Sequence, residues 1–339
     1  LIFFYDCNRI TIEGATDLAY SDDVRKRFEG YHWNVLEADG HDLAALDRAL
    51  AEARAEPRRP TLIIGRTIIG KGSPRLAGSA ESHGAPLGAD EVKAAKQALG
   101  LPPDEDFYVP EAVRDLVAAR GRELQAAEAR WQSAFRAWRA GHPDRAKAWD
   151  AAQSLDLPAD LESLLPAFDP AKAVATRSAS HAVIQKLAQA IPNLVGGSAD
   201  LAPSTRTIME GAGDIGPRSF AGRNFHFGIR EHAMGAILNG LALHGGFRAY
   251  GATFFVFADY FRSSIRLACI MKLPVIFVLT HDSFYVGEDG ATHQPVEHTM
   301  GLRLMPNLTV IRPSDPTETG AAWLAALRNK SGPTALLLT

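Results

Sequence analysis

The sequence has little cysteine and no excess of charge of one sign. Two of its 339 residues are cysteine, Cys7 and Cys269; their wide separation favours free thiols in a reducing compartment over a disulfide framework or a metal site. A net charge of −3 provides no basic face for nucleic acid or a membrane surface. No apolar run approaches the roughly 18 residues of a membrane span, and no signal peptide is visible. We therefore expect a cytoplasmic protein with no nucleic-acid or membrane partner.

The two ends of the chain carry continuous apolar runs. The chain opens without Met on LIFFY and closes on TALLLT. Such runs predict strands buried on both faces, as in the middle of parallel sheets. A natural protein seldom begins and ends inside its own core, so we expect a segment of a longer polypeptide.

Strand and helix patterns alternate in both halves of the chain. In the first half the strand-like runs LIFFY, WNVLEA and PTLIIGRTII flank helical patterns in SDDVRKRFEGY, with Ser21 as cap, and HDLAALDRALAEAR. In the second half LVGGSAD, RAYGATFFVF, LPVIFVLTHD and LTVIRP are strand-like, and EHAMGAILNGLALHG is helical. This alternation predicts the α/β class with parallel sheets.

The middle of the chain has a different pattern. Residues 102–171 are rich in Ala, Arg and Glu, and their apolar positions recur at helical spacing between prolines, which predicts a helical linker without chemistry. The predicted organisation is therefore two parallel-sheet domains, 1–101 and 172–339, joined by the linker 102–171.

Polar clusters follow the predicted strands repeatedly. They are DCN after LIFFY, GKGS after LIIGRTII, GGSADLAPS after PNLV, and HDSFYVGEDG after VIFVLT. Because ligands of open parallel sheets bind beyond the carboxyl ends of the strands, these clusters predict one composite site.

The stretch GEDGATHQPVEHT, residues 287–299, is unusually rich in ionisable groups. A zinc site is disfavoured, because His293 and His298 are five residues apart with Pro295 between them, whereas zinc-binding helices place two histidines one turn apart. Glu297 and His298 are expected at a helix start. On these residues alone, a solvated polar loop and a part of the composite site both remain open.

Six stretches together resemble the transketolase family, in the family's order. They are YDCNRITIEG, KGSPRLAGSAESHGAPLG, GGSADLAPS, GIREHAMG, TFFVFADY and GEDGATHQPVEH, and the resemblance covers essentially the whole chain. It implies two thiamine diphosphate-binding-type domains, with sites formed at a homodimer interface. The expected segments are the later part of the pyrophosphate-binding domain (1–101) and the pyrimidine-binding domain (172–339).

The resemblance implies a pocket for the cofactor's pyrimidine ring. Taken alone, Glu231 is a carboxyl at a helix start, which the helix dipole favours, and the stripe Phe254, Phe257 and Tyr260 is more often core than cofactor box. In the family, the counterpart of Glu231 hydrogen-bonds a ring nitrogen and helps the cofactor form its own base. The three aromatic residues match ring contacts, and Ile69 resembles the residue that props the cofactor in its bent shape.

A divalent cation on the diphosphate is the second implication. Asn8 and the carbonyl of Ile10 resemble ligands of Mg²⁺, for which Ca²⁺ or another divalent cation can substitute. The family's remaining ligand, an upstream aspartate, has no counterpart in this sequence. Cys7 stands where the family usually has Asp, at a position that is not a ligand. His83 resembles a histidine that contacts both the diphosphate and the substrate oxygen.

The resemblance also implies a site for a sugar phosphate. His281, Asp289 and His293 resemble residues around the donor sugar, and a positioned histidine suits proton transfer worth ~10²–10⁴-fold in rate. Arg177 and Ser204 match the family's phosphate-binding positions, where Arg and hydroxyl donors suit an anion.

Two further positions belong to this implied site. Asp200 matches a residue near the cofactor. The family has another phosphate-binding Arg just after the position of Thr339.

The activity implied is transketolase: reversible transfer of a two-carbon ketol group from xylulose 5-phosphate to ribose 5-phosphate, in the pentose phosphate pathway. Glu231, His293 and His83 are the expected catalytic residues. A dihydroxyacetone synthase-like ketol transferase is the nearest alternative. A chain that is an inactive fragment, or one subunit of a split enzyme, is another.

Overall fold

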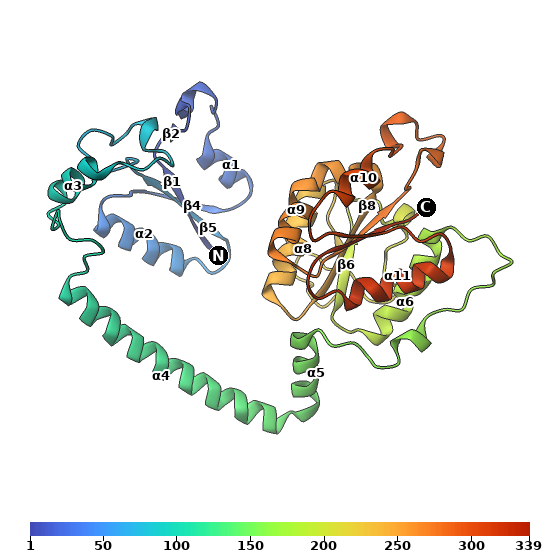
Figure 1. Ribbon diagram of the computed structural model, residues 1–339. Coiled ribbons are helices and arrows are strands. Elements are labelled where there is room, and N and C mark those ends of the chain that lie inside the picture. Colours follow the sequence, from blue (N-terminus) through green and yellow to red (C-terminus); the bar gives the residue numbers. More distant parts are fainter. The chain divides into compact units, whose positions relative to one another are not determined.

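The computed structural model describes all 339 residues and divides into two compact units, Leu1–Glu128 and Ala129–Thr339 (Figure 1). Each unit contains a parallel sheet covered by helices. The predicted α/β class with parallel sheets is therefore confirmed. No helix of the chain is long and apolar enough to cross a membrane.

The first unit is built on a three-stranded parallel sheet. Its order is β1 (Ile2–Cys7), β5 (Thr61–Arg66), β4 (Asn34–Asp39). Helix α2 (Leu43–Ala55) packs Ala49 and Ala53 on Ile63 of the central strand. The unit's other elements are the hairpin β2 (Ile10–Thr11) and β3 (Gly14–Ala15), η1 (Thr16–Leu18), α1 (Val24–Gly30), η2 (Ala80–Ser82) and α3 (Ala89–Ala98).

Within residues 1–339, β1 has one neighbouring strand, and Ile2, Phe3 and Phe4 are 38–51% exposed. The apolar run correctly predicts a strand here. One prediction for this unit is wrong in detail. The N-cap of α1 is Asp23 rather than Ser21, since only the residue next to the first turn can accept from the Lys26 amide, here at 3.1 Å.

Two helices occupy the middle of the chain, α4 (Glu111–Gly141) and α5 (Pro143–Ser154). The rings of Trp131, Phe135 and Trp138 stack along α4, with centroids 5.0 and 5.6 Å apart, because positions three and four apart share one helix face. Leu155 directly follows α5, and its carbonyl accepts a hydrogen bond from Arg248, a buried residue far along the chain that also donates to the carbonyl of Leu327. Burial lowers the pKa of the Arg248 guanidinium to about 10.

A six-stranded, entirely parallel sheet forms the centre of the second unit. Its order is β10 (Thr309–Ile311), β11 (Thr334–Leu337), β9 (Ile276–Thr280), β8 (Arg248–Phe254), β6 (Leu194–Ser198), β7 (Asn224–His226). Strand β11 is buried throughout, as the run TALLLT predicts.

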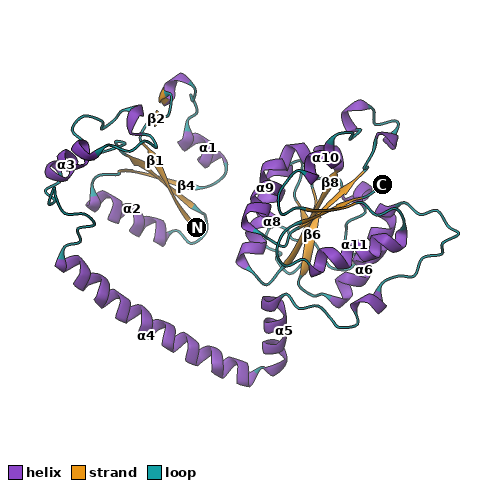
Figure 2. Ribbon diagram, viewed as in Figure 1, coloured by secondary structure: helices purple, strands orange, loops and turns teal.

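Helices cover both faces of this sheet (Figure 2). On one face lie α8 (Glu231–His244) and α9 (Arg262–Met271), and on the other α6 (Thr176–Ala190) and α11 (Pro316–Arg328). The shorter elements are η3 (Leu161–Leu164), α7 (Ala202–Thr205), η4 (Phe255–Phe261), η5 (Phe284–Val286), η6 (Ala291–His293) and α10 (His298–Arg303).

A glycine in β8 sets how closely α8 approaches the sheet. A Cβ added at Gly251 would lie 2.4 Å from Cδ1 of Leu238 on α8, closer than atoms can pack. The absent side chain lets α8 pack directly on the strand. Glu231, the first residue of α8, comes five residues after the carboxyl end of β7.

Candidate functional site

In the first unit, the predicted metal ligands lie at the carboxyl end of β1. Asn8 Oδ1 accepts a hydrogen bond from the Ile10 amide at 2.9 Å, and Arg9 between them has a left-handed backbone at φ 64°. The amide oxygen keeps a second lone pair for a cation. Asn8 Oδ1 and the Ile10 carbonyl are hard oxygen donors of the kind Mg²⁺ takes, and they fit as two ligands of an incomplete set.

The loop after β5 carries the other two predicted residues of this unit. Ile69 and His83 lie near its two ends, which run side by side: a Cβ added at Gly70 would lie 3.1 Å from Cβ of Ser82. Ile69 is half-buried and His83 exposed.

A buried carboxylate that sequence reasoning missed holds this loop. Glu91 of α3, 1% exposed, accepts from Ser73 Oγ, from the Arg75 amide at 2.9 Å and from Arg75 Nε at 2.6 Å. The hydrogen bond from Ser73, then those from Arg75, lower the pKa of Glu91 to about 2. The sequence signal was weak, because an acid in the first turn of a helix is common.

In the second unit, Glu231 faces a hollow of about 660 Å³. The hollow is lined by Ile229, Arg230, Glu231, His232, Ala233, Phe257 and Tyr260. Glu231 is 8% exposed, yet no protein hydrogen bond or ion pair engages its carboxylate. A ligand that filled the hollow would remove water from this carboxylate, and it would have to supply a hydrogen bond in return. This carboxyl, flanked by two aromatic rings, fits a flat heterocycle with a ring nitrogen.

The aromatic stripe lies along a 3-10 helix. Phe257 and Tyr260 belong to η4, and Phe254 immediately precedes it. Since a 3-10 helix has three residues per turn, side chains three apart project from one face. The rings of Phe254 and Phe257 are parallel with centroids 6.1 Å apart, and those of Phe257 and Tyr260 are 5.8 Å apart. The spacing of three was therefore the sequence signal for this short helix.

Both predicted substrate histidines contact this stripe. The His281 ring lies 3.7 Å from the Phe254 ring, centroid to centroid, and the His293 ring lies 5.2 Å from that of Phe257. His281 has a left-handed backbone at φ 58°, and its Nδ1 pairs with Thr280 Oγ1 at 2.9 Å. A non-glycine residue in this region is uncommon and is enriched at functional sites.

The groups that influence the pKa of His281 include two more of the predicted substrate residues, Arg177 and Asp289. Burial lowers the pKa of His281, the positive charge of Arg177 lowers it further, and Asp289 opposes the shift. Arg177, in the first turn of α6, and Asp289 thus lie near enough to act on this ring. The structure brings Arg177, His281, Asp289 and His293 together.

Asp200 and Ser204 follow the next strand, β6. Asp200 has a left-handed backbone at φ 62° and lines a separate hollow of about 350 Å³ with Ser198 and His226. Ser204 lies exposed on α7, outside that lining. Both residues therefore follow the carboxyl end of a strand, as the histidines do, but Asp200 lines a different hollow and Ser204 lies outside it.

An ion pair that sequence reasoning missed holds the loop after β9. Arg312 Nε donates to Oδ2 of Asp282 at 2.7 Å, and Asp282 is 9% exposed. Asp282 follows His281 directly, so the pair fixes the chain where the histidine leaves the sheet. Glu297 and His298 lie at the start of α10, as predicted.

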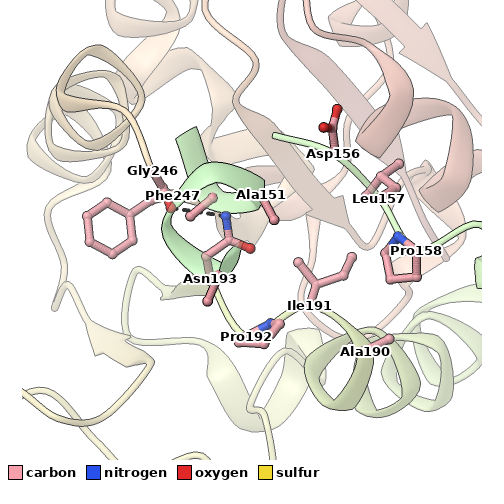
Figure 3. A pocket seen from close by; sticks show the side chains of 12 residues that line it. Ala151, Asp156, Leu157, Pro158, Ala190, Ile191, Pro192, Asn193, Gly246 and Phe247 are labelled. Atoms are coloured by element: carbon pink, nitrogen blue, oxygen red, sulfur yellow. Dashed lines mark hydrogen bonds between the residues drawn. The ribbon is translucent and has the colours of Figure 1, made fainter. Parts of the chain in front are cut away.

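Another hollow, of about 570 Å³ and lined mostly by apolar residues, lies at the amino end of the strands β6 and β8 (Figure 3). Pro192 and Asn193 precede β6, and Gly246 and Phe247 precede β8. Asn193 donates to the Gly246 carbonyl at 3.0 Å. The only ionisable lining residue, Asp156, is already bonded to Ser154 and Lys330. This hollow offers no free acid, base or nucleophile.

Two protein-family models match the chain. The model described as "Transketolase, thiamine diphosphate binding domain" matches residues 1–158. The model described as "Transketolase, pyrimidine binding domain" matches residues 172–339.

Curated proteins and solved structures are similar over the whole chain. Transketolase of Geobacillus stearothermophilus is 50% identical over 341 residues, covering 100% of this chain and 51% of the relative, and that of Bacillus subtilis is 46% identical with the same coverage. The crystal structures of transketolase from Leishmania mexicana (41% identical) and from Pichia stipitis in complex with sedoheptulose 7-phosphate (38% identical) each match with a TM-score of 0.95, covering 100% of this chain and 51% of theirs. The chain spans about half the length of these relatives.

Proposed function

The chain belongs to the transketolase family, and from that premise we propose that the protein transfers a two-carbon ketol group between sugar phosphates, with thiamine diphosphate as cofactor. One observation carries the proposal. Glu231 is 8% exposed, and its carboxylate lines a hollow walled by Phe257 and Tyr260 without a hydrogen bond to the protein. A carboxylate that only stabilises the fold would be hydrogen-bonded to other protein groups. A carboxylate that binds a ring nitrogen of a ligand must have no such partner in the protein.

The pyrimidine-side residues would hold the cofactor in defined roles. Glu231 would accept a hydrogen bond from a ring N–H and so keep the proton on that nitrogen. Phe257 and Tyr260 would flank the ring and exclude water, and Phe254, Ile69 and Asp200 would contribute further contacts. When bound, the cofactor supplies the carbon nucleophile that takes up the ketol unit.

The diphosphate and its cation would lie against the first unit's residues. Asn8 Oδ1 and the Ile10 carbonyl would contribute two oxygen ligands to Mg²⁺ or to Ca²⁺. His83, exposed at the end of its loop, would donate to a phosphate or substrate oxygen.

The cluster around His281 would hold the sugar. Because its pKa is lowered, His281 remains neutral at pH 7 and can accept a hydrogen bond from a hydroxyl. Asp289 would accept from another hydroxyl, and His293 would move a proton to and from the substrate oxygen as the carbon–carbon bond breaks and forms.

Arg177 and Ser204 would hold the phosphate end of the sugar. A guanidinium and a hydroxyl are suitable donors to a phosphate group. Solved transketolase structures from Pichia stipitis are complexes with xylulose 5-phosphate and sedoheptulose 7-phosphate. We therefore propose xylulose 5-phosphate as donor and ribose 5-phosphate as acceptor, in the pentose phosphate pathway of the cytoplasm.

The same premise extends to assembly and domain division. We propose a homodimer with its sites at the subunit interface, and a division of the chain at residues 101 and 171. The pyrimidine-binding model begins at residue 172, which supports the second boundary. The thiamine diphosphate-binding model runs to residue 158 and the first compact unit to Glu128, so both extend beyond the proposed boundary at 101.

The experiment is a coupled ketol-transfer assay with thiamine diphosphate and Mg²⁺. Glu231→Ala should lower kcat by about 100-fold or more, while Glu128→Ala, at an exposed glutamate of α4, should leave it unchanged. Unchanged turnover in Glu231→Ala would rule out the assigned role. Dihydroxyacetone synthase activity would be indicated by formaldehyde outcompeting ribose 5-phosphate as acceptor, and an inactive chain by absence of turnover in the parent protein.

A further inference from the structure

The histidine that ends the stretch GEDGATHQPVEH has no part in the mechanism above. His298 opens α10 and is 7% exposed. Its Nε2 lies 3.1 Å from Oδ2 of Asp259, a residue of η4. Its Nδ1 is buried without a hydrogen-bond partner, since Oε2 of Glu297, at 3.8 Å, is too far to accept.

This geometry decides which ring nitrogen carries the proton. A buried N–H without an acceptor is expensive, so the proton of neutral His298 lies on Nε2, where Asp259 accepts it. The result is a hydrogen bond from a nearly buried imidazole to a carboxylate that is 58% exposed, so solvent screens the charge on the Asp259 side. The bond joins the start of α10 to η4.

Asp259 lies in η4, close to the residues that line the hollow at Glu231. It lies between Phe257 and Tyr260, the two rings that wall the hollow at Glu231. Hydrogen-bond geometry in a 3-10 helix is poorer than in an α-helix, so such a segment depends on outside contacts.

The loop before α10 supplies those contacts from two sides. The His293 ring lies 5.2 Å from the Phe257 ring, and the His298 ring lies 5.6 Å from the Phe255 ring, in an edge arrangement. His293 thus contacts Phe257, on the side of η4 that faces the hollow, and His298 contacts Phe255, on the side that faces the apolar core. Only the second contact includes a hydrogen bond to η4.

We propose that the His298–Asp259 hydrogen bond holds η4 in the position at which Phe257 and Tyr260 flank the cofactor ring. His298 is then a positioning residue, which acts on binding through η4 and touches neither cofactor nor substrate. This inference rests on the proposed function, because the cofactor ring is the ligand that the two aromatic side chains flank.

The test is to measure the Kd of thiamine diphosphate for the purified protein by titration calorimetry in the presence of Mg²⁺. His298→Phe keeps the ring shape and removes the donor, so Kd should rise about tenfold. His298→Gln can place an amide N–H near Nε2, and its Kd should remain within about threefold of the parent. At saturating cofactor, kcat should fall less than twofold in both variants, because the reacting groups are intact.

A double variant and a control separate positioning from general damage. Asp259→Leu should raise Kd about as much as His298→Phe does, and the two changes together should be no worse than either alone, since they break one bond. His244→Phe, at an exposed histidine near the end of α8, should change nothing. Thermal unfolding of each variant reports whether it is folded.

Three results would overturn the inference. One is an unchanged Kd in a folded His298→Phe protein, and another is additive effects in the double variant. The third is tight Zn²⁺ binding that His298→Gln abolishes, because ligand atoms of Asp259, Glu297 and His298 lie within 4.8 Å of one another and would then form a metal site.

The outcomes also distinguish this inference from the proposed function. A parent protein that binds thiamine diphosphate without ketol transfer would refute the function while the binding series still decides the role of His298. A parent that does not bind the cofactor would refute both.

Discussion

In the first unit, hydrogen bonds and an ion pair to one buried carboxylate hold the site loop, whereas in the second unit the site residues lie on a sheet with apolar cores on both faces, and polar pairs such as Asp282–Arg312 fix single loops. In the first, the loop from Ile69 to His83 depends on the carboxylate of Glu91, beside a three-stranded sheet with an exposed edge. In the second, Glu231 and η4 lie on a six-stranded sheet with apolar cores on both faces. Polar anchoring depends on pH, and packing depends on shape, so the two halves of the site should fail under different conditions.

The largest effect should come from the packed core of the second unit. Trp323 is fully buried between α11 and the sheet, and its Nε1 donates to Ser180 Oγ at 2.8 Å. Trp323→Ala should lower the free energy of unfolding by about 3–5 kcal/mol, measured by denaturant titration. Trp131→Ala, at a ring that is 57% exposed, is the matched control and should cost far less. Both residues belong to the second unit, so equal losses would mean that burial of Trp323 in the core does not stabilise this unit.

An intermediate effect should come from Glu91, and it should depend on pH. The pKa of Glu91 in the folded protein is lowered to about 2 from its ordinary value of 4.5, so the stabilisation is fully present above about pH 4.5 and is lost as the pH falls toward 2. Below pH 4.5, the bond after Arg75 should become increasingly sensitive to an acid-stable protease. Glu91→Gln should show that sensitivity already at pH 7 and remove most of its pH dependence, and Asp90→Asn is the neighbouring control. A loop equally resistant at pH 7 and pH 2.5 would contradict the polar anchoring.

The smallest effect should come from the edge of the first sheet. Ile2 of β1 is 38% exposed and Ile63 of β5 is 1% exposed, although both belong to apolar runs. Ile2→Thr should change the free energy of unfolding by no more than about 0.5 kcal/mol. Ile63→Thr should cost several times more, because it buries a hydroxyl in the core. Similar losses in both would show that β1 is packed on both sides in solution.

Much of the fold could be read from local patterns. The apolar runs predicted β1, β5, β9 and β11, and the helical spacing in residues 102–171 predicted α4. The acid at the start of α8 and the helix start at His298 were also predicted correctly. Each of these features depends on residues within one or two turns of each other.

The candidate site was only partly predictable. The convergence of His281, Asp289 and His293 after β9 agrees with the expectation that polar residues beyond parallel strands form a site, whereas Arg177 comes from the first turn of α6. The side chains that hold them, Asp282 with Arg312, lie 30 residues apart and carry no local signal. Nothing in the order of residues indicates which distant acid a given arginine will meet.

The sequence by itself determined the period of each element, the order of strands and helices along the chain, and the residues that follow each strand. It did so because periods of two, three and 3.6 are properties of the local backbone. Only the tertiary structure decided that β5 lies between β1 and β4, that His298 meets Asp259 and that Glu231 lines a hollow without a hydrogen bond to the protein. Those outcomes depend on which distant segments pack together, and packing is set by the whole sheet rather than by any one stretch of it.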